Sequence, residues 1–385
     1  MTNKPSFKKF TFFRRLYRVL RKKMYLLSET AGSFLFLFLN EKPGVFSKEE
    51  IKNILLIRLD RVGDLILTTP ALKAIRDSYP AAKIDILVRR YTKELLFGNK
   101  SIDAVIEYES FSSRQECEMF LRKNNYDAAL VFHPGYQFNR LAYMSGAKWR
   151  AGYSGSGGSF FLNLILKDDR DVRIRHEVIS ALEVAAKVGV MQEQSLPEVK
   201  VSPENKAAAQ DFMKKNKIEG KFAVVHPGSR QEYIRWSKEG YAKVTKWLID
   251  TKKMKVVLTA GKDEYDYVLE TAFMVKEGAV IAEGLTLGVL TALISLSEVF
   301  VGNSTGPMHI AAALKVPTVA IFGNAHPLDS YKVWGPLSQN SKAVFSELNC
   351  EGCHPGDCRS FECKELITTE TVEAAIEEVL DKGER

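Results

Sequence analysis

The sequence predicts an α/β protein made of two doubly wound halves, each with a parallel sheet. Short, fully apolar runs alternate with helical segments, which is the pattern of βαβ units whose strands are buried on both faces. The alternation ends near residue 189 and begins again near residue 222, so the same pattern occurs twice. A length of 385 residues, with 45% hydrophobic and 26% charged residues, suits two globular domains.

The first half begins with a buried strand at residues 54–57, followed by a turn and a helix from 65 to about 78. Its other expected elements are strands at 84–88, 104–106 and 128–132 and helices near 113–123 and 176–188. Between them we expect a Gly/Ser-rich loop at 150–160, and a linker from 189 to about 203 closes this half.

The second half repeats this order of elements. Its expected strands are at 222–225, 255–259, 279–281, 299–301 and 316–323, and its expected helices are at 238–252, near 287–296 and at about 369–382. Two similar halves with a cleft between them suit a ligand that bridges the two domains.

The positive charge of the chain lies in its first 50 residues, with 11 Lys/Arg against 4 Asp/Glu, whereas the other 335 residues have 44 against 43. The folded body therefore gives little electrostatic reason to expect nucleic-acid binding. The apolar run at 34–39 is too short for a bilayer span or a signal peptide. Because a body of this size needs no disulfides, we expect a cytoplasmic protein.

Residues 8–27 predict a basic amphipathic helix. Phe10, Phe13, Tyr17, Leu20, Met24 and Leu27 form one apolar stripe, and six Lys/Arg lie between them with no acidic residue before Glu29. This pattern is typical of a helix that lies on an anionic membrane surface. The alternative is a helix that docks on the body of the protein or on a second subunit.

The segment 299–313 predicts an anion-binding site. A short strand ends at Gly302, small polar residues follow, and Pro307 stands near the first turn of an Ala-rich helix. The unpaired N–H groups and partial positive charge of such a helix start attract anions. Ser304, Thr305 and Gly306 form the loop, and His309 adds a donor one turn later. The alternative is an ordinary helix cap.

A second strand end, at His226–Ser229, should lie on the same sheet edge. Gly228 permits close backbone approach, Ser229 supplies a hydroxyl, and Arg230 and Arg235 offer guanidinium groups suited to phosphate. Two such turns in one sheet make a diphosphate site plausible. The strand between them ends at Asp263 and Glu264, whose carboxylates suit ribose hydroxyls but equally suit a helix N-terminus.

Two further sets of residues, Asp64 and four cysteines, can carry chemistry, and each set has more than one interpretation. Asp64 follows Gly63 at a strand-to-helix turn, where a carboxylate can act as a general base or as a helix N-cap, and residue type alone favours the cap. Four thiols within 14 residues can hold a structural zinc, form disulfides or stay free: Cys350, Cys353, Cys358 and Cys363. No catalytic role is expected for them.

Taken together, these segments resemble glycosyltransferase family 9, the ADP-heptose:lipopolysaccharide heptosyltransferases, over about residues 52–380. The matching motifs are Ile57-Arg58-x4-Gly63-Asp64-x4-Thr69-Pro70-Ala71-Leu72, Tyr126-Asp127-x3-Val131, His226-Pro227-Gly228-Ser229 with Arg235-Trp236, and Gly302 to Ala313 through Phe322-Gly323. The resemblance implies a GT-B fold of two Rossmann-like domains facing a cleft. It also implies an inverting sugar transfer that needs no catalytic metal, with Asp64 as the general base.

The resemblance also implies where substrates bind. The implied donor-binding residues are Gly63, Gly228, Ser229, Arg230, Arg235, Asp263, Glu264, Ser304, Thr305, Gly306 and His309. His133, Gln137 and Arg140 are candidate acceptor contacts, and a purely structural role is as good an interpretation for each. We expect an extension at 1–50, which lies outside the resemblance, an acceptor domain at 51–200, a donor domain at 201–368 with a Cys-rich loop at 350–363, and a helix at 369–385. The resemblance implies that this last helix crosses back to the first domain.

Two departures from the family pattern leave the donor open. The family usually has Asp where this chain has Ser304, and often has Lys where this chain has Ile234. We expect a glycosyltransferase that takes a nucleotide sugar, such as ADP-heptose, to a lipid-linked glycan acceptor at the cytoplasmic face of a membrane. The alternatives are a sugar-nucleotide epimerase of similar fold and a non-catalytic sugar-nucleotide-binding protein.

Overall fold

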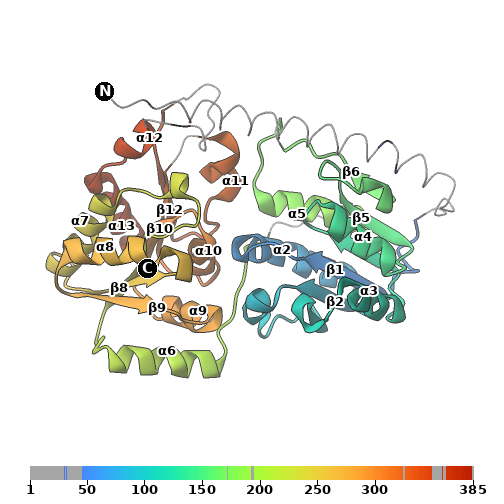
Figure 1. Ribbon diagram of the computed structural model, residues 1–385, viewed down its shortest axis with the longest axis horizontal. Coiled ribbons are helices and arrows are strands. Elements are labelled where there is room, and N and C mark those ends of the chain that lie inside the picture. Colours follow the sequence, from blue (N-terminus) through green and yellow to red (C-terminus); the bar gives the residue numbers. More distant parts are fainter. Residues whose placement is uncertain are drawn as a thin grey trace, which may run out of the picture.

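The apolar runs of the sequence form two parallel six-stranded sheets, each flanked by helices (Figure 1). The computed structural model describes residues 30, 32, 46–170, 172–191, 195–323, 326–348, 358 and 361–383. The predicted α/β fold with two parallel sheets is confirmed.

The first sheet has the strand order β3-β2-β1-β4-β5-β6. Its strands are β1 (Asn53–Arg58), β2 (Lys83–Val88), β3 (Ala104–Glu107), β4 (Ala128–Val131), β5 (Trp149–Tyr153) and β6 (Leu164–Leu166). The helices of this half are α2 (Val62–Ser78), α3 (Arg114–Lys123), α4 (Tyr136–Met144) and α5 (Glu177–Ala186).

The second sheet has the order β12-β11-β10-β7-β8-β9, which is the same topology. Its strands are β7 (Phe222–His226), β8 (Lys255–Ala260), β9 (Ala279–Glu283), β10 (Val299–Asn303), β11 (Thr318–Phe322) and β12 (Ser341–Phe345). Its helices are α6 (Pro203–Lys215), α7 (Lys238–Asp250), α8 (Tyr265–Val275), α9 (Leu287–Ser295), α10 (Gly306–Ala313), α11 (Tyr331–Trp334), α12 (Glu362–Glu365) and α13 (Thr369–Gly383). The strand order reverses between β1 and β4 and between β7 and β10, and ligands of doubly wound sheets bind at such points.

Alternation along the central strands separates two helix layers on each sheet. Ile54 and Leu56 of β1 belong to the core that contains α2 and α5, whereas Leu55 and Ile57 belong to the core that contains α3 and α4. The α2 and α5 core is continuous with that of α9 and α10, so these helices face each other between the two sheets. The arrangement brings the start of α2 to the start of α10.

Some predicted elements needed correction. The segment from Trp149 to Tyr153 is strand β5 and not loop, because Gly152 pairs in register with Val131 of β4. The Gly/Ser-rich loop begins only after this strand. Helices α4, α6, α11 and α12 and strands β6 and β12 were not predicted, because they are short or largely polar.

The prediction that the last helix crosses back to the first domain is wrong. The apolar residues Val372, Ile376 and Val379 of α13 lie in the core of the second domain, with Val225 and Val301. Two ion pairs join α13 to the same domain, from Lys252 in the loop after α7 to Glu377 at 2.7 Å and from Lys342 of β12 to Glu378 at 2.8 Å. The apolar stripe of α13 therefore packs against the outer face of the second sheet.

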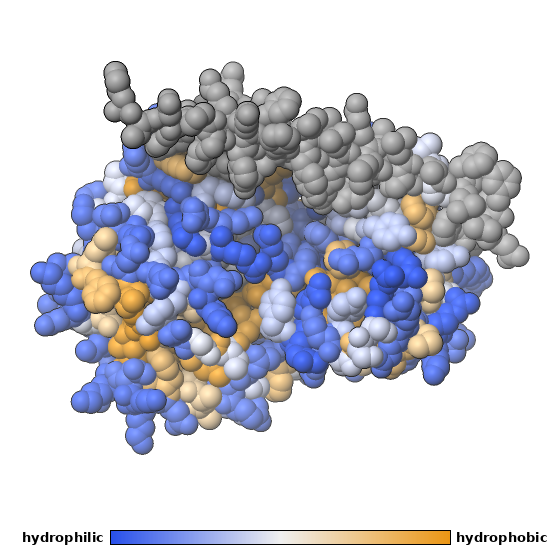
Figure 2. All heavy atoms as spheres, in the orientation of Figure 1, coloured by the Kyte–Doolittle hydropathy of each residue, from blue (hydrophilic) through white to orange (hydrophobic). Residues whose placement is uncertain are grey.

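Hydrophilic residues predominate on the face shown in Figure 2, and hydrophobic residues gather on the side of the second domain. Among the described residues, no helix combines the length and apolar character that a membrane crossing requires. The predicted basic helix at residues 8–27 lies outside the described residues.

Candidate active site

The two domains meet where α2 and α10 begin, and glycines allow the close approach. A Cβ added to Gly63 would lie 2.6 Å from Cδ2 of His309, and a Cβ added to Gly306 would lie 2.8 Å from Cβ of Val62. Gly63 and Gly306 therefore act by letting the two helix starts touch. Around this junction lie the carboxyl ends of β1, β7 and β10, the positions at which such sheets bind ligands.

Gly63→Ala should destabilise the protein by about 1–3 kcal/mol, because the methyl group overlaps the buried imidazole of His309. Thermal or urea unfolding measures this loss. A double-mutant cycle with His309→Ala supplies the control, since removal of the ring should abolish most of the cost of the added methyl group. An equal cost in both backgrounds would contradict the contact.

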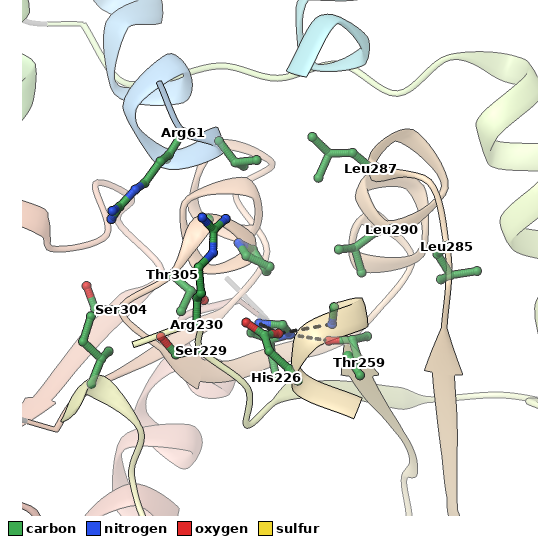
Figure 3. A pocket seen from close by; sticks show the side chains of 18 of the residues that line it. Arg61, His226, Ser229, Arg230, Thr259, Leu285, Leu287, Leu290, Ser304 and Thr305 are labelled. Carbon is green, nitrogen blue, oxygen red and sulfur yellow. Dashed lines mark hydrogen bonds and ion pairs between the residues drawn. The ribbon is translucent and has the colours of Figure 1, made fainter. Parts of the chain in front are cut away.

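A cavity of about 370 Å³ opens from this junction into the second domain. Figure 3 shows Leu285, Leu287 and Leu290 on one side of it, across from Arg61 and Arg230. Ser229, Ser304 and Thr305 line the space near the arginines. The cavity, called the first chamber below, thus has an apolar wall suited to a planar base and a polar, cationic end suited to phosphate.

Asn303 joins the two strand-end loops beneath this chamber. Its Nδ2 donates to the carbonyls of Pro227 at 2.7 Å and Gly228 at 3.3 Å, and its Oδ1 accepts from the backbone N–H of Trp236 at 2.9 Å. The side chain is fully buried. No role was predicted for Asn303. A polar amide at the end of a buried strand nevertheless indicates that its side chain forms hydrogen bonds with nearby backbone groups.

The two carboxylates that follow β8, those of Asp263 and Glu264, lie in different surroundings. Glu264 lines the first chamber, where its Oε2 accepts from the backbone N–H of Gly261 at 3.1 Å and lies 3.6 Å from Nε2 of His226. The same oxygen would lie 2.5 Å from a Cβ on Gly228, so the glycine makes room for it. Asp263 is exposed and does not line the chamber, and its role in donor binding stays a prediction.

A second cavity of about 610 Å³, called the second chamber, adjoins the first and contains Asp64. The N-cap of α2 is Arg61, so Asp64 lies in the first helical turn and the N-cap alternative is wrong. The carboxylate instead contacts a fully buried arginine: Nη2 of Arg58 lies 3.2 Å from Oδ1 of Asp64. The backbone of α2 thus orients Asp64 into the chamber while Arg58 holds it from behind.

Arg58 is shared among three carboxylates. Its Nη2 also lies 3.2 Å from Oε1 of Glu177, its Nε lies 3.0 Å from Oδ1 of Asp60, and its Nη1 donates to the carbonyl of Phe132 at 2.6 Å. Asp60 in turn lies 3.1 Å from Nδ1 of His133. The sequence analysis missed Glu177 and Asp60 as parts of the site.

This cluster sets the charge state of Asp64. Burial, followed by the field of Asp60, raises the pKa of Asp64 to about 6, and Arg58 opposes them only in part. Burial also acts to raise the pKa of Asp60, but Arg58 and His133 overcome it and lower that pKa. Asp64 is therefore the carboxylate that exchanges a proton near neutral pH, as a general base requires.

The two arginines predicted to bind phosphate lie in different places. Arg230 is exposed and lines both chambers. Arg235 lines neither: its Nε donates to the carbonyl of Ser229 at 2.6 Å and its guanidinium lies over the ring of Tyr267. The Arg235 side chain thus supports the Ser229 loop from behind, and its phosphate contact stays a prediction.

The prediction that His309 donates a hydrogen bond to a ligand stays a prediction, since a neutral imidazole still carries one N–H. His309 is buried, burial together with the neighbouring His176 lowers its pKa to about 3, and it lines the second chamber rather than the first. Its imidazole is neutral at physiological pH, so it offers no positive charge to a phosphate. It serves the contact with Gly63.

Of the three candidate acceptor contacts, only His133 lines the second chamber. Arg140 is paired with Glu118 of α3, which favours the structural alternative for it, and Gln137 is exposed outside both chambers. Acceptor contacts by these two residues stay predictions. The zinc prediction remains untested, because Cys350 and Cys353 lie outside the described residues.

Comparison with known protein families matches residues 116–363 to glycosyltransferase family 9 (heptosyltransferase). The chain belongs to glycosyltransferase family 9. As a family member it is a glycosyltransferase, which disfavours the epimerase and non-catalytic alternatives.

Individual relatives and solved structures that are similar to this family 9 glycosyltransferase support the same family. It is 26% identical over 298 residues to lipopolysaccharide heptosyltransferase 3 of Escherichia coli, with 72% of this chain and 84% of that protein covered. A family 9 glycosyl transferase from Veillonella parvula has a TM-score of 0.76 at 23% identity, covering 86% of this chain and 98% of its own. The E. coli ADP-heptose lps heptosyltransferase II has a TM-score of 0.72 at 23% identity, covering 86% and 100%. The fold is the GT-B fold of these enzymes.

Proposed function

We propose that this glycosyltransferase moves heptose from ADP-heptose to a lipopolysaccharide-core or similar lipid-linked glycan acceptor. One observation carries the proposal: a carboxylate with a pKa of about 6, Asp64, lies beside a chamber that has a base-sized apolar wall and a phosphate-binding end. The names of the relatives supply the donor and the acceptor, because they include heptosyltransferases of lipopolysaccharide and ADP-heptose.

The reaction follows from the placement of the two chambers. The donor base packs on the leucine wall, Glu264 faces the ribose, and the diphosphate lies near Ser229, Arg230 and the start of α10. The sugar then extends toward the second chamber, where the acceptor hydroxyl gives its proton to Asp64 as its oxygen bonds to the anomeric carbon. The bond from that carbon to the phosphate oxygen breaks, and the diphosphate leaves.

A single displacement of this kind inverts the anomeric centre. The charge of the departing diphosphate is met by the guanidinium group of Arg230 and by the N–H groups at the start of α10, so the proposed reaction uses no catalytic metal. Product analysis by NMR measures the anomeric configuration, and full activity in EDTA checks the proposed metal independence.

The proposed acceptor places the enzyme at the cytoplasmic face of a membrane. The basic stripe at residues 8–27 supports attachment to anionic lipid there. Flotation with vesicles of anionic and of neutral lipid tests the attachment: the proposal expects salt-sensitive binding to anionic vesicles alone.

The decisive test of function is a binding and turnover screen. Calorimetry with ADP, UDP, GDP and CDP, followed by ADP-heptose and other nucleotide sugars, should show binding of ADP and of ADP-heptose. Release of ADP should then require a lipid-linked acceptor. Preference for another nucleotide sugar would retain the transferase and change its donor, for which Ser304 and Ile234 leave room. No binding of any nucleotide would contradict the proposal.

Glu177→Gln should shift the acidic limb of the kcat/KM profile to lower pH, by up to about one unit. Glu177 is among the groups that raise the pKa of Asp64, so its neutralisation lets Arg58 lower that pKa further. Glu183→Gln, the same change on the same helix outside the cluster, should leave the limb in place. A profile from pH 5 to pH 9 measures both, and equal profiles for the two variants would contradict the assignment.

A further inference from the structure

Arg61 is an arginine at the cleft to which the proposed reaction assigns no role. It is the N-cap of α2, its side chain is exposed, and it lines both chambers. Within the described part of the chain this side chain makes no hydrogen bond or ion pair. It belongs to the first domain, whereas the rest of the phosphate-binding end of the first chamber belongs to the second.

The backbone places Arg61 beside the anion-binding start of α10. The next residue, Val62, would meet a Cβ on Gly306 at 2.8 Å, and Gly306 is the first residue of α10. In Figure 3, Arg61 extends from α2 and Arg230 from the loop after β7, and both lie on the side of the pocket across from the leucines. Two guanidinium groups from two domains therefore flank one helix N-terminus.

The other arginines at the chambers are already engaged. Arg89 donates to the carbonyl of Leu59 at 3.0 Å and pairs with Glu109 at 3.2 Å, and Arg170 pairs with Asp168 at 2.8 Å. Among described residues, only Arg61 and Arg230 of the arginines that line the chambers lack such a partner. Arg61 makes no ion pair with Asp329, whose pKa burial raises although His326 and Arg61 act to lower it.

Two unpaired guanidinium groups that face one space repel each other unless an anion lies between them. We propose that Arg61 binds the donor diphosphate from the first domain, opposite Arg230 of the second. The inference rests on the proposed function, which supplies the diphosphate. Donor binding then links the two domains through the diphosphate, and the same two side chains hold the leaving group as Asp64 activates the acceptor.

The test is an affinity series with the complete chain. Arg61→Ala should weaken ADP binding by about tenfold or more, as expected for a charge-assisted contact, and leave adenosine binding within about twofold. Arg61→Lys should recover part of the loss. Arg90→Ala is the matched control, because it removes the same charge from the same domain at a residue paired with Glu107 outside both chambers. Its ADP affinity should equal that of the unaltered protein.

The outcomes separate this inference from the proposed function. Equal ADP affinity in Arg61→Ala, or an equal loss for adenosine, would overturn the role of Arg61 while ADP binding by the unaltered protein upholds the function. A raised KM for the acceptor with unchanged ADP affinity would overturn it as well, by placing Arg61 at the acceptor. If the unaltered protein binds no nucleoside diphosphate, both proposals fail. An unchanged unfolding temperature of the ligand-free variant confirms that it is folded.

Discussion

Asp64→Asn should lower kcat by about 10³-fold and leave ADP affinity within about twofold, because it removes the proton acceptor and spares the first chamber. Asparagine keeps the shape of the side chain and its contact distance to Arg58. It cannot take a proton from the acceptor hydroxyl. Steady-state kinetics with ADP release and calorimetry with ADP measure the two quantities on the same preparation.

The same variant should gain stability above pH 6. The pKa of Asp64 is raised from 3.8 to about 6 in the folded protein, so the folded state holds this proton more tightly than the unfolded state. Ionisation of Asp64 therefore costs stability as pH rises from about 4 through 6, and asparagine avoids that cost. Thermal unfolding should show the variant at least as stable as the unaltered protein at pH 8, with the difference shrinking toward pH 4.

Asp77→Asn is the control, since it makes the same change at the other end of α2, where Asp77 is exposed beside Lys73. Activity and stability of this variant should match those of the unaltered protein. Retention of most of the activity by Asp64→Asn would remove Asp64 as the base. A loss of activity together with a loss of stability at pH 8 would point to a structural role.

Much of the fold was readable because parallel strands are buried on both faces. Runs such as 54–57 and 222–225 are continuously apolar and rich in β-branched or aromatic residues, as buried parallel strands are. Strand β5 was missed because Gly152 lies in it, and its strand state comes from pairing with Val131, 21 residues away. The amphipathic stripe of α13 was visible, but a stripe does not say which domain covers it.

The site was predictable where it depends on strand ends and not where it depends on distant partners. Asp64, Ser229 and Thr305 stand at strand-to-helix turns, which the topology brings to one edge, although the role of Asp64 as a base was expected only from the family resemblance. Glu177 meets Arg58 across 119 residues of sequence, and no local pattern announces that contact. Arg235 and Arg61 both lie near a strand end, yet only Arg61 faces the cavity, because the backbone direction at each position decides where a side chain extends.

Replacement of Arg58 should have the largest effect on stability. Arg58→Met keeps the length of the side chain and removes the positive charge that Asp60, Asp64 and Glu177 share at 3.0–3.2 Å. A buried charge that loses its partner costs about 3–5 kcal/mol. Urea unfolding at pH 8 should show a loss of this order, with kcat reduced as well, because Asp64 loses the group that orients it.

The pH dependence of this loss distinguishes electrostatics from packing. In the unaltered protein Arg58 lowers the pKa of Asp60, so Asp60 contributes stability above its unfolded pKa and loses it as pH falls. Without Arg58, burial governs Asp60 and Asp64, their pKa values rise, and the variant becomes less stable as pH rises. Its deficit should therefore be smallest near pH 4 and largest near pH 8, whereas a packing defect would be the same at both.

Glu177→Gln added to Arg58→Met should recover part of the stability at pH 8, because one of the uncompensated carboxylates becomes neutral. The same change should recover less at pH 4, where protonation has already relieved the repulsion. A second-site change that stabilises only in the absence of Arg58, and only at high pH, has no explanation in packing alone. Recovery of this kind would show that Arg58 holds the three acidic side chains together. Their proximity in turn keeps the pKa of Asp64 near neutral beside the diphosphate site. A double variant no more stable than Arg58→Met at pH 8 would contradict this account.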